Sequence, residues 1–334
     1  MSRPIFPRWL ALAMVLVPAS AVADCRQPER QCIGLVTDVG TINDKSFNQA
    51  AWEGVQQAGT TLGAPVKYIE TRDAKDYGNN IRLFADNGYK VIVTVGFGLG
   101  EATAKAAAKY PALRFIGVDQ FQAKPLANVA GLVFHEDRAG FMAGALAAML
   151  TGTNTVAAIF GSDLVPPIKA FRRGFEAGVR HVNPAVRVIA TFHPGGLETG
   201  FTDPEWGAVT AKQAIDQGAD VVFAAGGTTG NGALVEVAGH RGKLCLGVDA
   251  DQWLTLPEAR PCLVASAMKL ISASVADLIE KAASGPFPAG NVFGAVALSA
   301  FHDFENRIDP QTRKRLEMIE KDLAAGVLVV PVGH

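Results

Sequence analysis

The chain has 334 residues, a length that favours two domains rather than one. Apolar residues make up 49% of it and charged residues 19%, a composition that excludes intrinsic disorder. The net charge of −1 excludes the overall basic field that nucleic-acid binding needs, so we expect no nucleic-acid partner.

Residues 1–23 have the ordered features of a signal peptide. Arg3 and Arg8 precede an apolar stretch at residues 9–17, and small residues at 21–23 form a cleavage site. The apolar stretch is too short to cross a bilayer comfortably. We therefore expect export, with cleavage after Ala23 and a periplasmic location. A buried N-terminal helix or an uncleaved anchor is the alternative.

The chain has four cysteines, Cys25, Cys32, Cys245 and Cys262, and no C-x-x-C pair that would suggest zinc or redox chemistry. Pairing Cys25 with Cys32 and Cys245 with Cys262 closes the shortest loops and is our prediction. The other two pairings, or four reduced thiols in the core, are the alternatives. Cys25 also suggests a lipid anchor. However, Asp24 stands where a small residue usually precedes a lipid-modified cysteine, so we favour an unanchored protein.

Short apolar runs alternate with helical stretches through the first half of the chain. The predicted strands are 32–38, 66–70, 91–95, 113–118 and 129–134, and the predicted helices are 47–62, 77–87, 101–110 and 137–150. Continuous apolar strands that alternate with amphipathic helices are typical of a parallel sheet covered on both faces. The predicted fold class is therefore α/β, doubly wound.

The same pattern starts again in the second half. Predicted strands lie at 155–160, 186–192, 221–225, 244–248 and 292–298, with a terminal strand at 327–332, and predicted helices lie at 206–217, 270–284 and 311–325. We expect two lobes. The first comprises residues 24–134 with about 266–290, and the second comprises 135–265 with about 291–334. Several chain crossings between the lobes would form a hinge.

Polar residues and glycines follow four of the predicted strands, beginning at Asp38, Asp119, Gly226 and Asp249. Ligands of such sheets bind beyond the carboxyl ends of the strands. Each cluster alone is an ordinary helix cap or turn. Four clusters at one edge favour a polar cleft.

One long motif resembles a known family. Residues 38–54 read D-x-G-x-x-N-D-K-S-F-N-Q-x-x-W-E-G, similar to the signature of the basic membrane protein (BMP) family. The resemblance continues in order through F-I-G-V-D at 115–119, G-F-M-A-G-A-L-A at 140–147, F-x-x-G-F-x-A-G at 171–178, G-A-D-V-V-F-A-A-G-G at 218–227 and G-V-D-A-D-Q at 247–252.

Members of this family are substrate-binding proteins of ABC transporters, typified by purine nucleoside receptors. The resemblance implies a type I periplasmic-binding-protein fold, hinge closure on a ligand and no catalytic activity. It also implies a small-molecule ligand and a permease as partners. We expect a monomer without a cofactor or a metal.

The resemblance implies which residues hold a purine base. Phe47 would stack on one face of the base, and Phe201 matches the second stacking aromatic, with Trp206 as the alternative. Asn43 and Asp44 would hydrogen-bond to the base edge, because an amide and a carboxylate together offer donors and acceptors.

It likewise implies a sugar site. Asp119 and Asp249 would accept hydrogen bonds from ribose hydroxyls, and Lys269 would donate to an oxygen and balance their charge. Gly227 would let the backbone approach the sugar. Free purine bases, riboflavin and sugars are the alternative ligands.

An enzyme is the rival class, for example a nucleoside-cleaving hydrolase that uses Asp249 and Asp251. The chain has no H-E-x-x-H, no G-x-S-x-G and no G-x-x-x-x-G-K-[ST] motif. His135-Glu136-Asp137 is the densest cluster of potential metal ligands, and it is more typical of a helix start. We therefore expect a binding protein.

Overall fold

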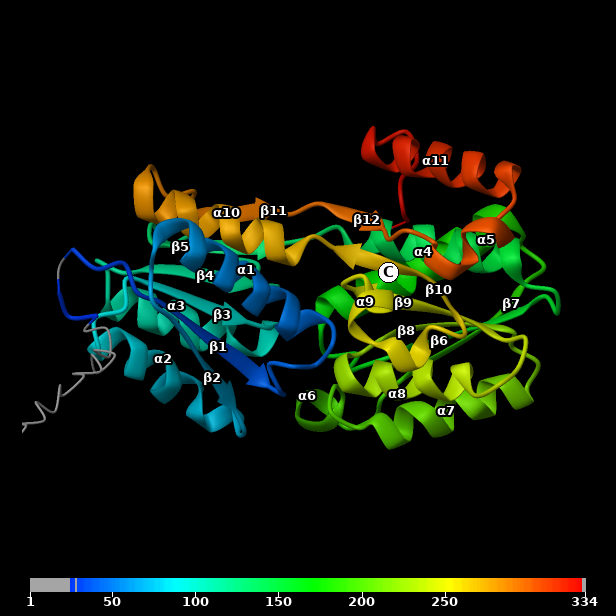
Figure 1. Ribbon diagram of the computed structural model, residues 1–334, viewed down its shortest axis with the longest axis horizontal. Coiled ribbons are helices and arrows are strands. Elements are labelled where there is room, and N and C mark those ends of the chain that lie inside the picture. The colour runs from blue at the N-terminus through cyan, green and yellow to red at the C-terminus, as the bar shows by residue number, and fades with distance from the viewer. Residues whose placement is uncertain (1–24, 28, 332–334) are drawn as a thin grey trace, which may run out of the picture.

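The computed structural model describes residues 25–27 and 29–331 and has two lobes side by side (Figure 1). The predicted signal peptide at 1–23 lies outside the described residues. Each lobe is a six-stranded sheet with helices on both faces. No described helix combines the length and apolar character needed to cross a membrane.

The sheet of the first lobe has the order β11-β5-β4-β3-β1-β2, and all its pairs are parallel. Its strands are β1 (Ile33–Val39), β2 (Val66–Thr71), β3 (Val91–Val95), β4 (Arg114–Val118), β5 (Val129–Val133) and β11 (Gly290–Phe293). Helices α1 (Phe47–Leu62) and α10 (Ile271–Ser284) share one core cluster with the sheet, and α2 (Tyr77–Asp86) and α3 (Gly100–Lys109) share another. Every residue of β3 is buried, as its continuous apolar sequence predicts.

The second lobe repeats this arrangement with the order β12-β10-β9-β8-β6-β7. Its strands are β6 (Thr155–Phe160), β7 (Arg187–Phe192), β8 (Val221–Ala225), β9 (Leu244–Asp249), β10 (Leu263–Lys269) and β12 (Val296–Leu298), which runs antiparallel to β10. Helices α4 (Glu136–Leu150), α5 (Pro166–Val182) and α11 (Pro310–Ala324) contribute to one core cluster. Helices α7 (Pro204–Asp216) and α8 (Gly227–Ala238) contribute to the other. The prediction of a doubly wound α/β fold with two lobes is confirmed.

Two of the glycine-rich motifs serve the packing of α4 against α5. A Cβ added at Gly140 would lie 2.3 Å from the carbonyl oxygen of Phe171, and one at Gly144 would lie 2.0 Å from that of Phe175. Backbone cannot move aside as a flexible side chain can. These glycines therefore allow the two helices to touch.

The chain crosses between the lobes at about residues 134–135, 270 and 294–295, because β5 and β11 belong to the first sheet and β10 and β12 to the second. Since β10 stays in the second sheet to Lys269, the return to the first lobe begins at about 270 rather than 266. The strand predicted at 292–298 is two strands in different sheets, because Gly294 and Ala295 form the crossing between them. The terminal strand predicted at 327–332 is wrong over its described part, where residues 327–331 form no strand and Val327 is 77% exposed.

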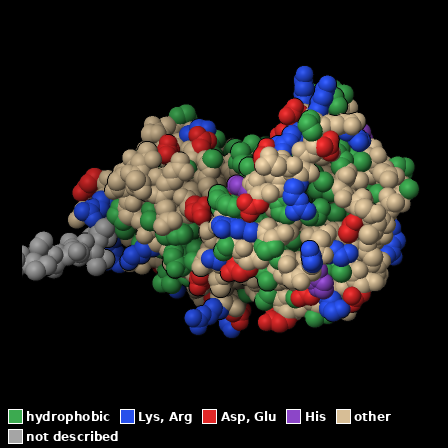
Figure 2. Space-filling view, turned by 45° about the vertical axis from the view of Figure 1, so that its right-hand side comes forward, with side chains coloured by type: hydrophobic (Ala, Val, Ile, Leu, Met, Phe, Trp, Pro, Cys, Tyr) green, Lys and Arg blue, Asp and Glu red, His purple; other side chains and the backbone are tan. Residues whose placement is uncertain are grey.

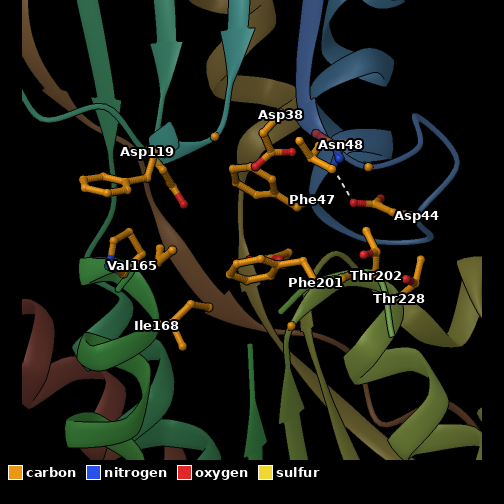
Figure 3. Close-up of a pocket in the computed structure, with 18 of the residues that line it drawn as sticks. Asp38, Asp44, Phe47, Asn48, Asp119, Val165, Ile168, Phe201, Thr202 and Thr228 are labelled. Carbon is orange, nitrogen blue, oxygen red and sulfur yellow. Dashed lines mark hydrogen bonds between the residues drawn. The ribbon is translucent and has the colours of Figure 1, made fainter. Parts of the chain in front are cut away.

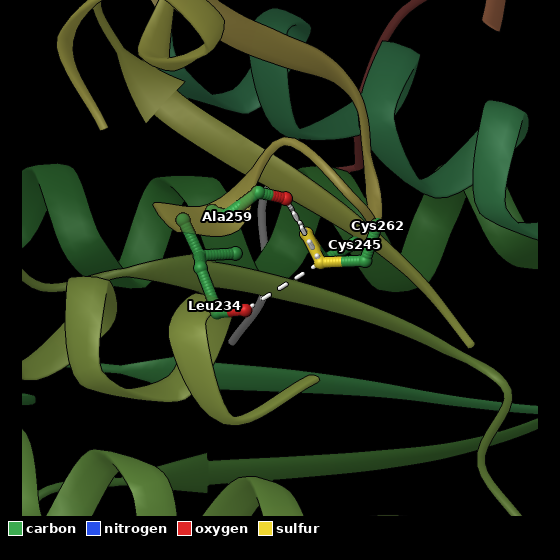
Figure 4. Close-up of a disulfide and its surroundings, with 4 residues drawn as sticks. All are labelled: Leu234, Cys245, Ala259 and Cys262. Atoms are coloured by element: carbon green, nitrogen blue, oxygen red, sulfur yellow. Dashed lines mark hydrogen bonds between the residues drawn. A yellow bond between two sulfur atoms is a disulfide. The ribbon is translucent and has the colours of Figure 1, made fainter. Parts of the chain in front are cut away.

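The structure joins Cys25 to Cys32 and Cys245 to Cys262, the pairs that close the shortest loops. The first disulfide ties the N-terminal segment to the residue before β1. The second joins β9 to the residue before β10, with the carbonyl oxygens of Leu234 and Ala259 beside the Cys262 sulfur (Figure 4). On the face shown in Figure 2, acidic and basic side chains are interspersed.

Candidate functional site

A cavity of about 360 Å³ lies between the lobes, at the carboxyl ends of both sheets (Figure 3). The segments that follow β1, β3 and β4 line it from the first lobe, and those that follow β6, β8 and β9 line it from the second. Its volume falls within the range of about 300–1,000 Å³ that is usual for small-molecule sites.

Two aromatic rings face this cavity from opposite lobes. Phe47 is the first residue of α1, and Phe201 lies between α6 (Gly196–Thr199) and α7 (Figure 3). Trp206 does not line the cavity; its ring lies 4.6 Å from that of His193 in an edge contact. Of the two candidates for the second stacking residue, the structure therefore brings Phe201 to the cavity.

The structure does not bring Asn43 to the cavity. This side chain is exposed, and its Oδ1 accepts a hydrogen bond of 2.9 Å from Lys45 Nζ. Two residues that sequence reasoning did not select, Asp38 at the end of β1 and Asn48 in the first turn of α1, line the cavity instead. The available signal for Asp38 was its place at the end of an apolar strand. Asn48 could have been selected as a cavity residue because it directly follows Phe47 at the start of the helix.

Asp44 lines the cavity and also caps α1. Its carboxylate accepts from the backbone N–H groups of Ser46, Asn48 and Gln49 at 3.0, 2.9 and 3.1 Å. These bonds satisfy the free N–H groups at the helix start and occupy much of the carboxylate's accepting capacity. Burial nevertheless raises the pKa of Asp44 to about 6.

Asp38 is the carboxylate with fewer partners at this end of the cavity. Burial and, after it, the negative charge of Asp44 raise its pKa to about 7, against the opposing effect of a hydrogen bond from the Asn48 side chain. Near neutral pH, Asp38 therefore exists in both the ionised and the protonated form.

Lys269 lies at the centre of a buried group of charges, which we call the lysine cluster: Lys269, Asp119, Asp249 and Glu136. Its Nζ lies 2.7 Å from Asp119 Oδ2, 3.5 Å from Asp249 Oδ1 and 3.7 Å from Glu136 Oε1. Burial alone would lower the pKa of Lys269, but the three carboxylates outweigh it and raise the pKa above its ordinary value. Lys269 therefore stays charged.

The lysine cluster joins both lobes. Asp119 directly follows β4 of the first lobe, Asp249 ends β9 of the second, and Lys269 ends β10 just before a crossing. Both aspartates have a positive φ, of 59° and 64°, which turns the side chain at the end of the strand. Glu136, at the start of α4, does not line the cavity. Burial raises its pKa to about 8.

Two buried oxygens of the lysine cluster have no hydrogen-bond partner among the described residues. Lys269 donates to Asp119 Oδ2 and Ser46 Oγ donates to Asp249 Oδ2, so neither Oδ1 accepts a hydrogen bond. Asp249 Oδ1 has only the longer ion pair with Lys269 Nζ at 3.5 Å. A buried acceptor without a donor costs about 1–3 kcal/mol. A ligand with two hydroxyl groups would remove this cost.

Segments of the first lobe contact the second directly beside the cavity. Asn231 Nδ2 donates to the carbonyl oxygen of Asp44 at 2.8 Å, and Thr255 Oγ1 donates to that of Lys45 at 2.6 Å. The single hydroxyl proton of Ser46 is shared between Asp249 Oδ2 at 3.1 Å and the carbonyl oxygen of Val248 at 3.2 Å. The loop at residues 44–46 therefore holds the two lobes together at the rim.

Gly227 begins α8 and lines the cavity with a positive φ of 56°. A Cβ here would lie 3.0 Å from the carbonyl oxygen of Phe201. The conformation and the close approach both favour glycine at this position.

The pair of carboxylates expected for a hydrolase is not assembled. Asp249 lines the cavity, but Asp251 does not; its Oδ2 lies 2.7 Å from Nε2 of His302. Among the described residues, no group of three or more His, Cys, Asp or Glu side chains could hold a metal ion.

Three comparisons connect this chain to known proteins. The Bmp family model, described as ABC transporter substrate-binding protein PnrA-like, matches residues 33–295. The ABC transporter nucleoside-binding protein BmpA of Lactococcus lactis subsp. cremoris is 29% identical over 309 residues, which cover 84% of this chain and 86% of that protein. A crystal structure of an ABC transporter solute-binding protein from Aeropyrum pernix K1 matches with a TM-score of 0.80 and 25% identity, covering 91% of this chain and 94% of that one.

Proposed function

This chain belongs to the Bmp family of PnrA-like ABC transporter substrate-binding proteins, and from this premise we propose that it captures a purine nucleoside or a free purine base for a membrane permease. The transport role follows from the family. The choice of ligand rests on the cavity, and on the nucleoside-binding relative from Lactococcus lactis.

The arrangement of Phe47 and Phe201 supports a flat ligand. Two rings that face one cavity from opposite lobes can enclose a heterocycle when the lobes close (Figure 3). Base–aromatic stacking contributes about 1–3 kcal/mol per base where it has been measured in nucleic-acid binding. Asp38 would accept a hydrogen bond from an N–H group on the edge of the base, with Asn48 beside it.

The two aspartate oxygens of the lysine cluster that accept no hydrogen bond favour a nucleoside over a free base. Ribose has vicinal hydroxyls that could donate to Asp119 Oδ1 and Asp249 Oδ1 together. Lys269 already donates to Asp119 Oδ2, so a positive charge lies beside both acceptors. This is the single observation that favours a nucleoside over a free base.

The same contacts explain how binding would close the hinge. Phe47, Asp38 and Asp119 come from the first lobe, and Phe201 and Asp249 from the second. A ligand that touches both sets binds the closed form more tightly than the open form and shifts the population toward it. The closed form would then dock on the permease.

The Cys25–Cys32 disulfide supports the proposed unanchored, periplasmic protein. A lipid thioether and a disulfide require the same sulfur atom of Cys25, which the structure joins to Cys32. Disulfides are typical of exported proteins. A mass measurement of the mature protein would distinguish the two uses of this sulfur.

The test is a thermal-shift panel on the mature protein, after unfolding and refolding to remove any bound ligand. The panel contains inosine, guanosine, adenosine, cytidine, hypoxanthine, adenine, riboflavin and ribose. A ligand at a hundred times its dissociation constant adds about 2.7 kcal/mol of stability, enough to raise the melting midpoint by several degrees.

A shift with purine nucleosides is the expected result. A shift with bases alone would contradict the assignment of Asp119 and Asp249 to a sugar. A shift with riboflavin or ribose alone would show that the ligand is not a purine. Chromatography of each nucleoside after incubation should return it unchanged. Cleavage that disappears in Asp249→Asn would show an enzyme instead.

A further inference from the structure

One wall of the cavity offers no polar group to a ligand. Val165, Pro167, Ile168 and Phe171, which we call the apolar wall, line the cavity from the segment after β6 and the first turns of α5. Val165, Ile168 and Phe171 are 7%, 8% and 1% exposed. A polar ligand group placed against these four side chains would find no side-chain partner there.

The backbone at the start of α5 also offers no unbonded N–H group to a ligand. The start of a helix normally presents unbonded N–H groups, and such groups bind hydroxyls and anions. Here Pro166 and Pro167 occupy the first turn and have no N–H, and the N–H groups of Ile168 and Lys169 both bond to the carbonyl oxygen of Val165 at 3.1 and 3.2 Å. The helix start is therefore closed to hydrogen bonding as well.

The apolar wall lies at the sugar end of the proposed site. Figure 3 shows Val165 and Ile168 on the side of the cavity that holds Asp119, whereas Thr202 and Thr228 lie on the side of Asp44. Phe171 lies beneath the lysine cluster, with Lys269 Nζ 5.9 Å from its ring centre. A ribose whose 2′ and 3′ hydroxyls are held by the lysine cluster would thus have the apolar wall at its opposite face.

We infer that this protein selects purine nucleosides whose 5′ carbon carries no hydroxyl, namely 5′-deoxy and 5′-thioether nucleosides. The inference rests on the proposed function. In a ribofuranose ring the 5′ carbon leaves C4′ on the face opposite the 2′ and 3′ hydroxyls. When those hydroxyls face Asp119 and Asp249, the 5′ substituent faces the apolar wall, where a hydroxyl would be buried without a partner.

The test is calorimetric titration with three nucleosides on the purine that the panel ranks first: the 5′-hydroxyl parent, its 5′-deoxy form and its 5′-methylthio form. The 5′-deoxy form should bind about tenfold more tightly than the parent, because no hydroxyl is left unpaired. The methylthio form should bind at least as tightly as the deoxy form, and this arm tells whether the wall has room for a thioether.

Val165→Thr adds a hydroxyl to the wall with almost no change of shape. It should reduce the ratio of the affinity for the 5′-deoxy form to the affinity for the parent about fivefold. Val209→Thr, on the exposed face of α7, is the matched control and should keep the wild-type ratio. A parent nucleoside that binds as tightly as its deoxy form would overturn the inference and leave nucleoside binding intact. A preference that Val165→Thr does not change would overturn the assignment to this wall. If no nucleoside binds, the proposed function fails and the inference with it.

Discussion

The segments after β1 and β6 occupy corresponding places in the two sheets, yet they build opposite walls of the cavity. Asp44 lies in the first, close to Asp38 at the end of β1, and the carboxylate of Asp44 caps the helix that follows. The second contains Val165 and Ile168, and prolines begin its helix. The fold decides where these segments lie, and the local residues decide whether the wall is polar.

The carboxyl ends of β4 and β9 show the reverse relation, since the sequence Gly-Val-Asp stands at both, at residues 117–119 and 247–249. Asp119 and Asp249 both adopt a positive φ and both face Lys269. A buried glutamine, Gln120 directly after Asp119 and Gln252 three residues after Asp249, fills the space beside the glycine two residues before each aspartate. Where the two lobes share residues, they share chemistry.

The largest effect should come from Lys269→Met, which removes the only cation of the lysine cluster. We expect the free energy of unfolding at pH 7 to fall by about 3–5 kcal/mol, because buried carboxylates lose their partner. Urea denaturation measures it. Lys105→Met breaks an exposed pair with Glu101 and should leave the free energy of unfolding nearly unchanged, because solvent screens such pairs. Since protonation would neutralise the carboxylates, the deficit of Lys269→Met should shrink in acid. An equal loss of unfolding free energy in both variants would contradict the role of Lys269 as the partner of the buried carboxylates.

Asp249→Asn should come next, with a loss of nucleoside affinity of about 1.5–3 kcal/mol, the usual contribution of a hydrogen bond to a charged group. Free bases should bind as before, because they have no ribose. Asp251→Asn, two residues away and outside the cavity, is the control for calorimetry. Equal losses for nucleosides and bases would remove Asp249 from the sugar site.

Phe47→Ala should weaken the binding of nucleosides and of bases alike, by about 1–3 kcal/mol, because both kinds of ligand stack on this ring. Phe121→Ala is the matched control, since this ring is 68% exposed and does not line the cavity. Circular dichroism should show an unchanged fold in both. Wild-type affinity in Phe47→Ala would mean that the ligand does not lie on this ring.

The smallest effect should be the pH dependence due to Asp38. Its raised pKa of about 7 means that protonation removes the acceptor as the pH falls below 7, so affinity should drop several-fold between pH 8 and pH 6. Asp38→Asn should make the affinity nearly independent of pH in this range.

Stability should respond in the opposite sense. The folded state binds the Asp38 proton more tightly than the unfolded state, so the wild type loses stability as the pH rises from about 4 to about 7. Asp38→Asn should therefore be the more stable protein at pH 8, and the difference should vanish near pH 4. A wild type that is more stable than this variant at pH 8 would show that Asp38 is better solvated than its raised pKa implies.

Much of this protein could be predicted from its sequence, because strand and helix periodicity depends on neighbouring residues. The predicted strand at 91–95 coincides with β3, and the predicted helix at 47–62 with α1. Asp119 and Asp249 were also predictable, because in parallel sheets the residue at the carboxyl end of a strand faces the ligand edge.

The tertiary structure alone decided which of these residues meet. Lys269 and Asp119 are 150 positions apart, and only the order of strands in two sheets brings them within 2.7 Å. Loop direction likewise turned Asn43 outward and left Asp38 in the cavity. Periodicity describes one element at a time, whereas burial, pKa and the division of the cavity into a polar and an apolar wall depend on elements distant in the chain.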